Sequence, residues 1–223
     1  MRLRKKKHLE ERMELVKDIL LFVEGIDFYL RPQQEKINLF DFATLFGNTN
    51  PTHLEIGCGK GQFVAEMAKL NPNINFVAIE KVSNVIVSAC ELVKKENLTN
   101  VRFLNCCAEN LEFYIKPQTL SKIYLNFSCP YPKSTYANHR LTNVKFLQIY
   151  KKLMLPQAEI HQKTDNQLLF EYSIEQLSQN GFAFKEVSLD LHKSKFKGNV
   201  ETEYETNFVK LGKPIFRLEA YLK

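Results

Sequence analysis

The segment LEIGCGKG (54–61) is the first place where residue types and spacing suggest chemistry. Gly57, Gly59 and Gly61 follow a short apolar run, where a strand would lead into a helix. Glycines at such a turn let the backbone approach a ligand closely, and the amides of the helix point at it. The G-x-G-x-G spacing differs from the G-x-G-x-x-G of dinucleotide sites, which disfavours a nicotinamide dehydrogenase, and no Lys-Ser/Thr follows as in a P-loop. A nucleotide-like ligand of another kind is predicted.

Two carboxylates indicate the charge of that ligand. Glu55 precedes the glycines, where a pyrophosphate would otherwise lie, and the two negative groups would repel each other. A cationic ligand is therefore favoured, and S-adenosylmethionine fits because it has a sulfonium and an α-amino group but no phosphate. Glu80 ends the next predicted strand, at the place where an acid accepts hydrogen bonds from ribose hydroxyls. The alternative interpretation of Glu80 is an ordinary solvated acid.

Two further strand ends carry polar or reactive side chains. Cys107 follows the third predicted strand, where an adenine edge would lie, although a small buried apolar residue is the alternative. The segment NFSCPYPK (126–133) follows the fourth strand, with two prolines that stiffen it, Tyr131 as a stacking face and Lys133 within reach of a phosphate. Arg140 adds positive charge. Because open α/β sheets place their chemistry at this edge, a functional loop is favoured over a rigid connector.

The elements that must position these residues alternate regularly along the chain. Strands are predicted at 52–57, 74–80, 101–105, 122–127 and 158–164, and helices at 61–70, 83–97, 142–154 and 167–180. This alternation predicts an α/β fold with a parallel sheet that helices cover on both faces. Strands at 182–191 and 214–222 close the chain, and the last one is expected to run antiparallel because no full crossover precedes it.

The N-terminal part differs from the rest in charge. Residues 1–17 contain seven Lys or Arg against three Asp or Glu, whereas the whole chain of 223 residues has a net charge of +6. A basic extension (1–24) with a helix over 9–23 is predicted, followed by a stretch over 25–49 without a regular pattern and a single domain over 25–223. Such a leader favours a polyanionic partner, most often nucleic acid; a solubilising tail and acidic lipid are the alternatives.

Composition excludes several classes of protein. No apolar run approaches the ~18 residues of a membrane span, and no apolar core of a signal peptide follows the first charges. Five cysteines form an odd set without C-x-x-C spacing, which argues against a disulfide framework or a zinc knuckle and fits the cytoplasm. The histidines are scattered, so no metal site is predicted, and His161 is interpreted as a packed residue.

Taken together, the motifs resemble those of the bacterial tRNA (guanine-N7-)-methyltransferase family. The resemblance covers about residues 52 to 217 and rests on LEIGCGKGQF, IYLNFSCPYPK, HQKTDN (161–166), LFEYS (169–173) and NVETEYE (199–205). It implies a Rossmann-like class I methyltransferase fold with a mostly parallel seven-stranded sheet. It also implies methyl transfer from S-adenosylmethionine to N7 of a guanine in the tRNA variable loop. Whether the protein is a monomer or a homodimer is left open.

The resemblance also implies roles for individual residues. The cofactor would be bound by Glu55, Gly57, Gly59, Gly61, Glu80, Cys107 and Cys129, and the tRNA by Lys133, Arg140, Asp165, Thr202, Glu203, Tyr204 and Glu205. Cys129 stands where the family usually has the catalytic-site Asp, and Cys107 also replaces an Asp. Each change removes a carboxylate beside a cationic cofactor and should weaken binding or slow turnover. An RNA-binding protein with weak or no turnover is therefore the alternative function.

The chemistry itself does not require those carboxylates. Guanine N7 has an in-plane lone pair and no proton, so its attack on a methyl group needs alignment rather than a general base. Asp165, Glu203 and Glu205 could stabilise the cationic product electrostatically or accept hydrogen bonds from the guanine edge. Asp165 is alternatively an N-cap for the helix that begins near Gln167, and Thr202 with Glu205 fits a capping box.

Overall fold

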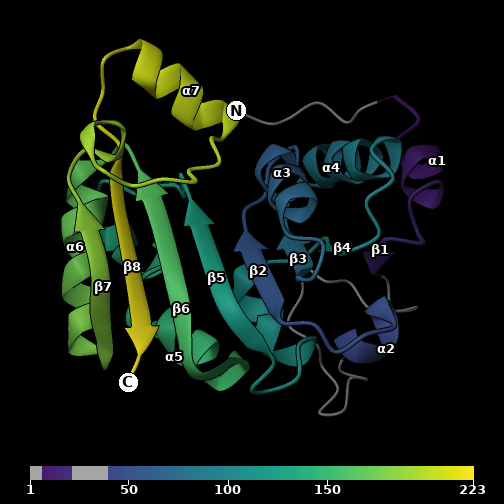
Figure 1. The fold of residues 1–223 in the computed structure, drawn as a ribbon, viewed down its shortest axis with the longest axis horizontal. Helices are drawn as coiled ribbons and strands as arrows, with labels where there is room; N and C mark the ends of the chain where they lie inside the picture. The colour runs from purple at the N-terminus through teal and green to yellow at the C-terminus, as the bar shows by residue number, and fades with distance from the viewer. Residues whose placement is uncertain (1–6, 22–39) are drawn as a thin grey trace. The chain divides into compact units, whose positions relative to one another are not determined.

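The computed structural model describes residues 7–21 and 40–223, apart from the side chain of Glu203 (Figure 1). The described part consists of two compact units, which belong to Met1–Lys116 and Pro117–Lys223. Parts of two predicted segments lie outside the described residues: 1–6 and 22–24 of the basic extension, and 25–39 of the stretch that follows it. The prediction of one domain over 25–223 stays a prediction. In the described ranges, every helix is too short or too polar to cross a membrane.

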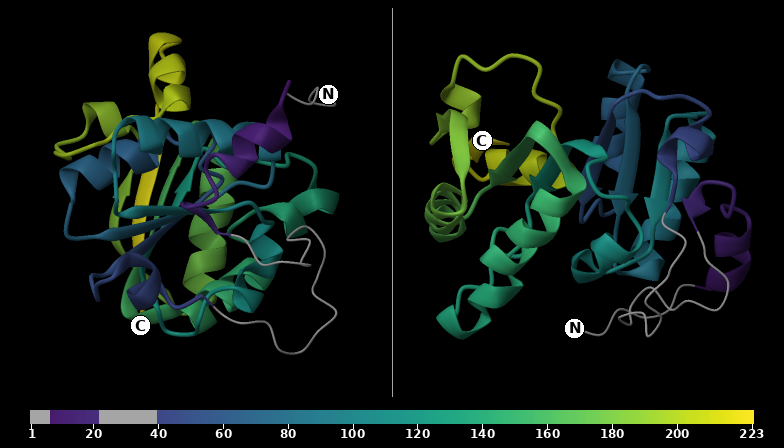
Figure 2. Two further views of the ribbon diagram at one scale, coloured as in Figure 1. Left: turned by 90° about the vertical axis from the view of Figure 1, so that its right-hand side faces the viewer. Right: turned by 90° about the horizontal axis from the view of Figure 1, so that it is seen from below.

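The first unit is built on buried parallel strands. β2 (Thr52–Ile56), β3 (Asn75–Ile79) and β4 (Val101–Leu104) pair in parallel, with β3 in the middle. Every residue of β2 and β3 is buried, as expected for strands that are covered on both faces. The helices α3 (Gln62–Leu70) and α4 (Ser83–Lys95) follow β2 and β3 and pack against each other (Figures 1 and 2). The predicted strand–helix alternation is confirmed here.

The predicted helix over 9–23 is wrong in its second half. α1 ends at Glu14, and Leu20–Leu21 forms the short strand β1, which pairs in parallel with β4. The open edge of β4 offers backbone partners that a continued helix would leave unused; the Phe103 amide donates to the Ile19 carbonyl at 2.8 Å. With β1 the described strands number four in each unit, one more in total than the seven implied by the resemblance. A short helix, α2 (Phe42–Phe46), also forms where no regular element was predicted.

The second unit combines parallel and antiparallel strands. β5 (Leu120–Asn126) pairs in parallel with β6 (Met154–Thr164), while β8 (Phe216–Leu222) runs antiparallel to both β6 and β7 (Phe182–Ser188). The expected reversal of the last strand is thus confirmed. The helices of this unit are α5 (Val144–Leu153), α6 (Gln167–Gln179) and α7 (Glu203–Lys210), and α6 lies alongside β7 (Figures 1 and 2). Gly181, with φ +81°, ends α6 as predicted.

Gly61 provides a test of the packing in the first unit. It precedes α3 with φ +85°, and a Cβ at this position would lie 2.7 Å from the Ala89 Cβ of α4. Left-handed strain of ~1–2 kcal/mol and overpacking of ~1–3 kcal/mol should add, so Gly61→Ala should lower the free energy of unfolding by roughly 2–5 kcal/mol in a urea titration. Gly47→Ala is the control, because Gly47 has φ +68° with nothing within 4 Å of a Cβ and should lose only the strain. Equal losses for the two variants would contradict the close helix approach.

Candidate active site

The glycine turn after β2 is tied to the end of β3. The amides of Gly57 and Cys58 donate to the Ile79 carbonyl at 2.8 and 3.0 Å. Gly57 and Gly59 have φ values of +81° and +57°, and open space lies where their Cβ atoms would be. A bare backbone with room beside it agrees with the turn that the sequence predicted, and its contact with a nucleotide-like ligand stays a prediction.

Two carboxylates accompany this turn, as predicted. Glu55 is buried in β2, and Glu80 follows β3 in a half-buried position. Burial first, and then the charges of Glu55 and Glu80, raise the pKa of the Cys58 thiol well above its usual value. The backbone bonds from Gly57 and Cys58 to Ile79, the residue before Glu80, place both carboxylates beside the same turn. These two carboxylates favour a cationic ligand over an anionic one, although Lys60 in the turn and Lys81 after Glu80 carry the opposite charge.

Glu80 is held by a residue that the sequence reasoning missed. The side-chain Nδ2 of Asn105 donates to the backbone carbonyl of Glu80 at 2.7 Å, and its Oδ1 accepts from the Ser83 hydroxyl at 2.7 Å. One Glu80 carboxylate oxygen, Oε1, accepts from the Val82 amide at 2.9 Å. These bonds fix the loop that presents Glu80. An Asn directly after a buried strand was the signal that could have identified Asn105.

Cys107 lies next along the first unit. It precedes the 3₁₀ helix η1 (Ala108–Phe113) in a half-buried position, and its carbonyl accepts from the Asn110 amide at 3.0 Å. The neighbouring Cys106 is buried, which raises the pKa of its thiol far above the usual range. Of the two cysteines, only Cys107 is accessible enough to meet a ligand. The cofactor contact of Cys107 stays a prediction.

In the second unit, the loop after β5 has an unusual backbone. Phe127 and Tyr131 adopt left-handed φ values of +49° and +42°, which are rare for residues with side chains, and they bracket the exposed Cys129. Strained residues of this kind persist only where the surroundings enforce them, and they are common at functional sites. The Phe127 amide is held by the Lys163 carbonyl at 2.8 Å.

Arg140 holds the other end of this loop. Its Nε donates to the Pro130 carbonyl at 3.1 Å and its Nη2 to the Tyr131 carbonyl at 3.0 Å. The guanidinium also lies 4.4 Å from the centroid of the Tyr172 ring. The structure therefore gives Arg140 a positioning role in the loop that carries Cys129 and Lys133, and its contact with tRNA stays a prediction.

The TEYE segment (202–205) begins α7, and its residues point in different directions. Thr202 is the N-cap and accepts from the Glu205 amide at 3.0 Å, which confirms half of the capping box. The other half is wrong, because the Glu205 carboxylate binds Lys163 Nζ at 2.5 Å, Asn199 Nδ2 at 2.6 Å and His192 Nε2 at 2.9 Å. Glu205 is fully buried, so its carboxylate anchors α7 instead of facing solvent.

The alternative interpretation of Asp165, as the N-cap of α6, is wrong. The N-cap of α6 is Asn166, whose side chain accepts from the Leu169 amide at 2.8 Å. Asp165 instead pairs with Lys213 Nζ at 3.2 Å, and the same Nζ lies 4.7 Å from the centroid of the Phe208 ring on α7. A carboxylate at the end of β6 is thus kept at the half-exposed surface beside α7.

An aromatic stack joins α7 to the loop after β5. The Phe127 ring stacks on Tyr204 at 6.4 Å and on Phe208 at 5.9 Å between centroids. Tyr204 is nevertheless 62% exposed. The second unit therefore brings Asp165, Thr202, Tyr204 and Glu205 together on or beside α7, with Tyr204 as the most accessible of them; the side chain of Glu203 lies outside the described part.

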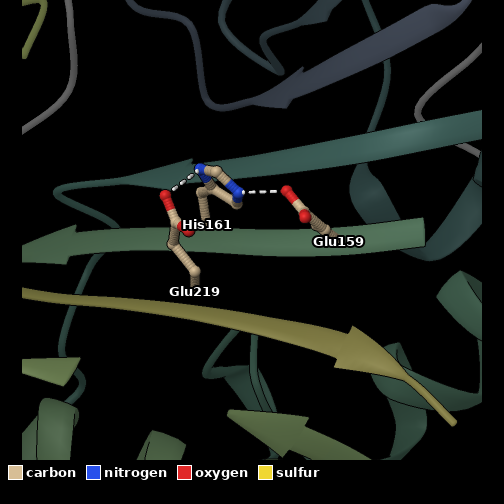
Figure 3. Close-up of side chains that lie close together, drawn as sticks. All are labelled: Glu159, His161 and Glu219. Carbon is tan, nitrogen blue, oxygen red and sulfur yellow. Dashed lines mark hydrogen bonds and ion pairs between the residues drawn. The ribbon is translucent and has the colours of Figure 1, made fainter. Parts of the chain in front are cut away.

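A separate cluster in this unit has the geometry of a metal site. Glu159, His161 and Glu219 offer ligand atoms within 4.8 Å of one another, with His161 between the carboxylates (Figure 3). Each carboxylate already has a cation: Lys122 and Lys185 lie 3.0 and 2.9 Å from Glu159, and Arg217 bonds to Glu219. A metal ion would have to compete with these fixed charges, so we interpret the cluster as an ion-pair network. His161 is 14% exposed and packs against Tyr124, in agreement with its interpretation as a packed residue.

The comparisons with known proteins come from sequence and from structure. A family model described as a putative methyltransferase matches residues 49–218, so the chain belongs to a methyltransferase family. A tRNA (guanine-N(7)-)-methyltransferase of Bacillus cytotoxicus is 43% identical over 99% of this chain and 96% of its own. That of Bacillus subtilis is 48% identical over 79% of this chain and 83% of its own. The chain therefore belongs to the tRNA (guanine-N(7)-)-methyltransferase family.

Solved structures show the fold. An antibiotic-related methyltransferase aligns with a TM-score of 0.64 at 19% identity, over 84% of this chain and 97% of its own. The 16S rRNA methyltransferase KamB aligns with a TM-score of 0.63 at 14% identity, over 87% and 99%. The predicted Rossmann-like methyltransferase fold is confirmed. Because the curated relatives are named as enzymes, the alternative of an RNA-binding protein without turnover is not favoured.

The cluster around His161 predicts how stability depends on pH. Burial, together with the charge of Lys122, lowers the pKa of His161 to about 3. Burial alone would raise the pKa of Glu159, but hydrogen bonds from Lys185, His161 and Lys122 lower it to about 2. Below the ordinary histidine pKa of 6.5, His161 binds a proton in the unfolded chain but stays neutral in the folded protein. As the pH is lowered, the free energy of unfolding should therefore fall by up to ~1.4 kcal/mol per pH unit, and protonation of Glu159 in the unfolded chain should add to this loss below pH 4.5.

We expect His161→Gln to flatten this dependence between pH 6.5 and 4.5, measured by urea titration at several pH values. His8→Gln, at an exposed position before α1, is the control and should leave the slope as it is. Parallel curves for the wild type and His161→Gln would show that the folded protein accepts the proton on His161.

Proposed function

We propose that this protein transfers a methyl group from S-adenosylmethionine to N7 of a guanine in tRNA. The observation that carries the proposal is the open glycine turn after β2 with Glu55 and Glu80 beside it, in a chain of this family. The glycine turn, Glu55 and Glu80 of the first unit are assigned to the cofactor and most of the named residues of the second unit to the RNA; the cofactor contact of Cys129 stays a prediction. The substrate would place the protein in the cytoplasm, where tRNA is modified.

The residues of the first unit fit the proposed cofactor. The open backbone at Gly57 and Gly59 gives room for close approach, and Glu80 has a carboxylate fixed by the Val82 amide that could accept from ribose hydroxyls. Glu55 adds negative charge for a sulfonium or an α-amino group. When bound, S-adenosylmethionine supplies a methyl group that is made electrophilic by its sulfonium.

The residues of the second unit orient the nucleophile. N7 attacks with its lone pair, so a C–N bond forms as the C–S bond breaks, and no proton has to be removed. This is why an exposed thiol at Cys129 is compatible with the reaction. The guanine becomes cationic, and the Asp165 carboxylate beside α7 could stabilise that charge or accept from the N1–H and N2–H₂ edge. Lys133 is proposed to contact a phosphate.

The reaction can be tested by its product. Purified protein incubated with labelled S-adenosylmethionine and unmodified tRNA should yield 7-methylguanosine, detected by nucleoside analysis and by chain cleavage at the modified base. Heat-denatured protein is the control for chemical methylation. Label found only at another atom of the RNA would defeat the proposed position, and no label at all would defeat the activity.

The cofactor site can be tested separately by calorimetry. Glu80→Ala removes a charged hydrogen-bond acceptor, each such bond being worth ~1.5–3 kcal/mol, so S-adenosylmethionine should bind about ten-fold or more weakly. Glu66→Ala, which removes an exposed acid of α3 in the same unit, should bind like the wild type. Unchanged affinity of Glu80→Ala would place the ligand elsewhere.

A further inference from the structure

An exposed aromatic surface in the second unit is not explained by the fold. The 3₁₀ helix η2 (Ser134–His139) has no buried residue, yet it carries two aromatic rings. The rings of Tyr131 and His139 lie 5.4 Å apart, those of Tyr136 and His139 6.1 Å apart, and Tyr136 is 50% exposed. We call Tyr131, Tyr136 and His139 the aromatic surface. Because these rings add little to a core, another use is indicated.

The backbone beneath this surface is built to a fixed shape. Tyr131 lies between Pro130 and Pro132 in the left-handed conformation, and Arg140 binds the carbonyl groups of Pro130 and Tyr131. Arg140 is in turn stacked on Tyr172 of α6. The position of the rings is thus enforced from below, as expected for a binding surface rather than for a loose connector.

The chain near this surface is basic, which favours one kind of partner. Between Glu112 and Glu159 the sequence contains seven Lys or Arg residues and no Asp or Glu, although Lys122 pairs with Glu159. Lys133 is exposed and directly precedes η2, and Arg140 directly follows η2. A basic segment with interleaved aromatic rings fits a polyanion that has flat, apolar faces, which is the chemistry of a nucleic acid strand.

A base can use such a surface only when it is unpaired. In a duplex the faces of the bases are covered by their neighbours, whereas unstacked bases of loops stack on aromatic side chains at ~1–3 kcal/mol each. We propose, on the basis of the proposed function, that the aromatic surface stacks a second, unpaired base of the RNA substrate, distinct from the guanine that is methylated. Tyr136 is half exposed and would provide the stacking face, and Lys133 would contact the adjoining phosphate.

Three variants at one position separate stacking from other effects. Tyr136→Phe keeps the ring, Tyr136→Leu keeps apolar area without a ring, and Tyr136→Ala removes both. We measure their binding to a fluorescent single-stranded RNA, to the same RNA as a duplex and to tRNA, at several salt concentrations. The leucine and alanine variants should bind single-stranded RNA and tRNA about ten-fold more weakly, while the phenylalanine variant and all duplex affinities stay as in the wild type.

Salt dependence distinguishes the base contact from the phosphate contact. Tyr136→Ala should leave the slope of log affinity against log salt unchanged, whereas Lys133→Ala should reduce the slope by about 0.7. Thermal unfolding should be the same for all variants, because Tyr136 belongs to η2, which buries no residue, and Lys133 is exposed. Tyr136→Leu binding like the wild type, or an equal loss on duplex RNA, would overturn the proposal.

Turnover separates this proposal from the proposed function. With tRNA, the KM of Tyr136→Ala should rise about ten-fold, while kcat at saturating tRNA stays within about two-fold of the wild type. If the wild type does not methylate tRNA, the proposed function fails, and the binding series still decides on the aromatic surface. If the wild type methylates tRNA and Tyr136→Ala has an unchanged KM, only the aromatic surface is refuted.

Discussion

In both units the chain leaves a buried parallel strand through left-handed backbone, and the candidate site of each unit depends on that turn. After β2 the turn is made by glycines, which adopt positive φ without steric strain and leave open space beside the backbone. After β5 it is made by Phe127 and Tyr131, which do so only under restraint. The first turn can therefore admit a ligand against bare backbone, whereas the second presents fixed side chains.

The restraints on the second turn come in part from residues of α6 and α7. Phe127 is held by the Lys163 carbonyl and by its stack on α7, and Tyr131 is held by Arg140, which rests on Tyr172 of α6. α7 is held in turn by the buried pair of Lys163 and Glu205. Removing one partner of such a pair usually costs about 3–5 kcal/mol, because the other charge stays buried without compensation. The loop and α7 thus stabilise each other.

This arrangement divides the charged residues of the motifs into two groups. Arg140 and Glu205 direct their charges to partners within the unit, so they shape the surface. Lys133, Tyr136 and Tyr204 stay exposed and are the residues for which we propose contact with RNA. Proximity in a motif therefore does not show contact with a substrate, since neighbours such as Tyr204 and Glu205 face opposite environments.

The sequence alone determined the features that depend on near neighbours. Apolar runs located the buried strands, the glycines after β2 and Gly181 after α6 marked positive φ, and Thr202 marked a helix start, because each depends on a few adjacent residues. The tertiary structure decided what depends on distant partners. Pairing with the edge of β4 replaces the second half of the predicted N-terminal helix by β1. The Glu205 carboxylate binds Lys163, 42 positions away, instead of completing the capping box. The choice of Asn166 over Asp165 as N-cap was also decided there, since Lys213 lies 48 positions from Asp165. Such partners meet only when the chain has folded, and no local pattern records them.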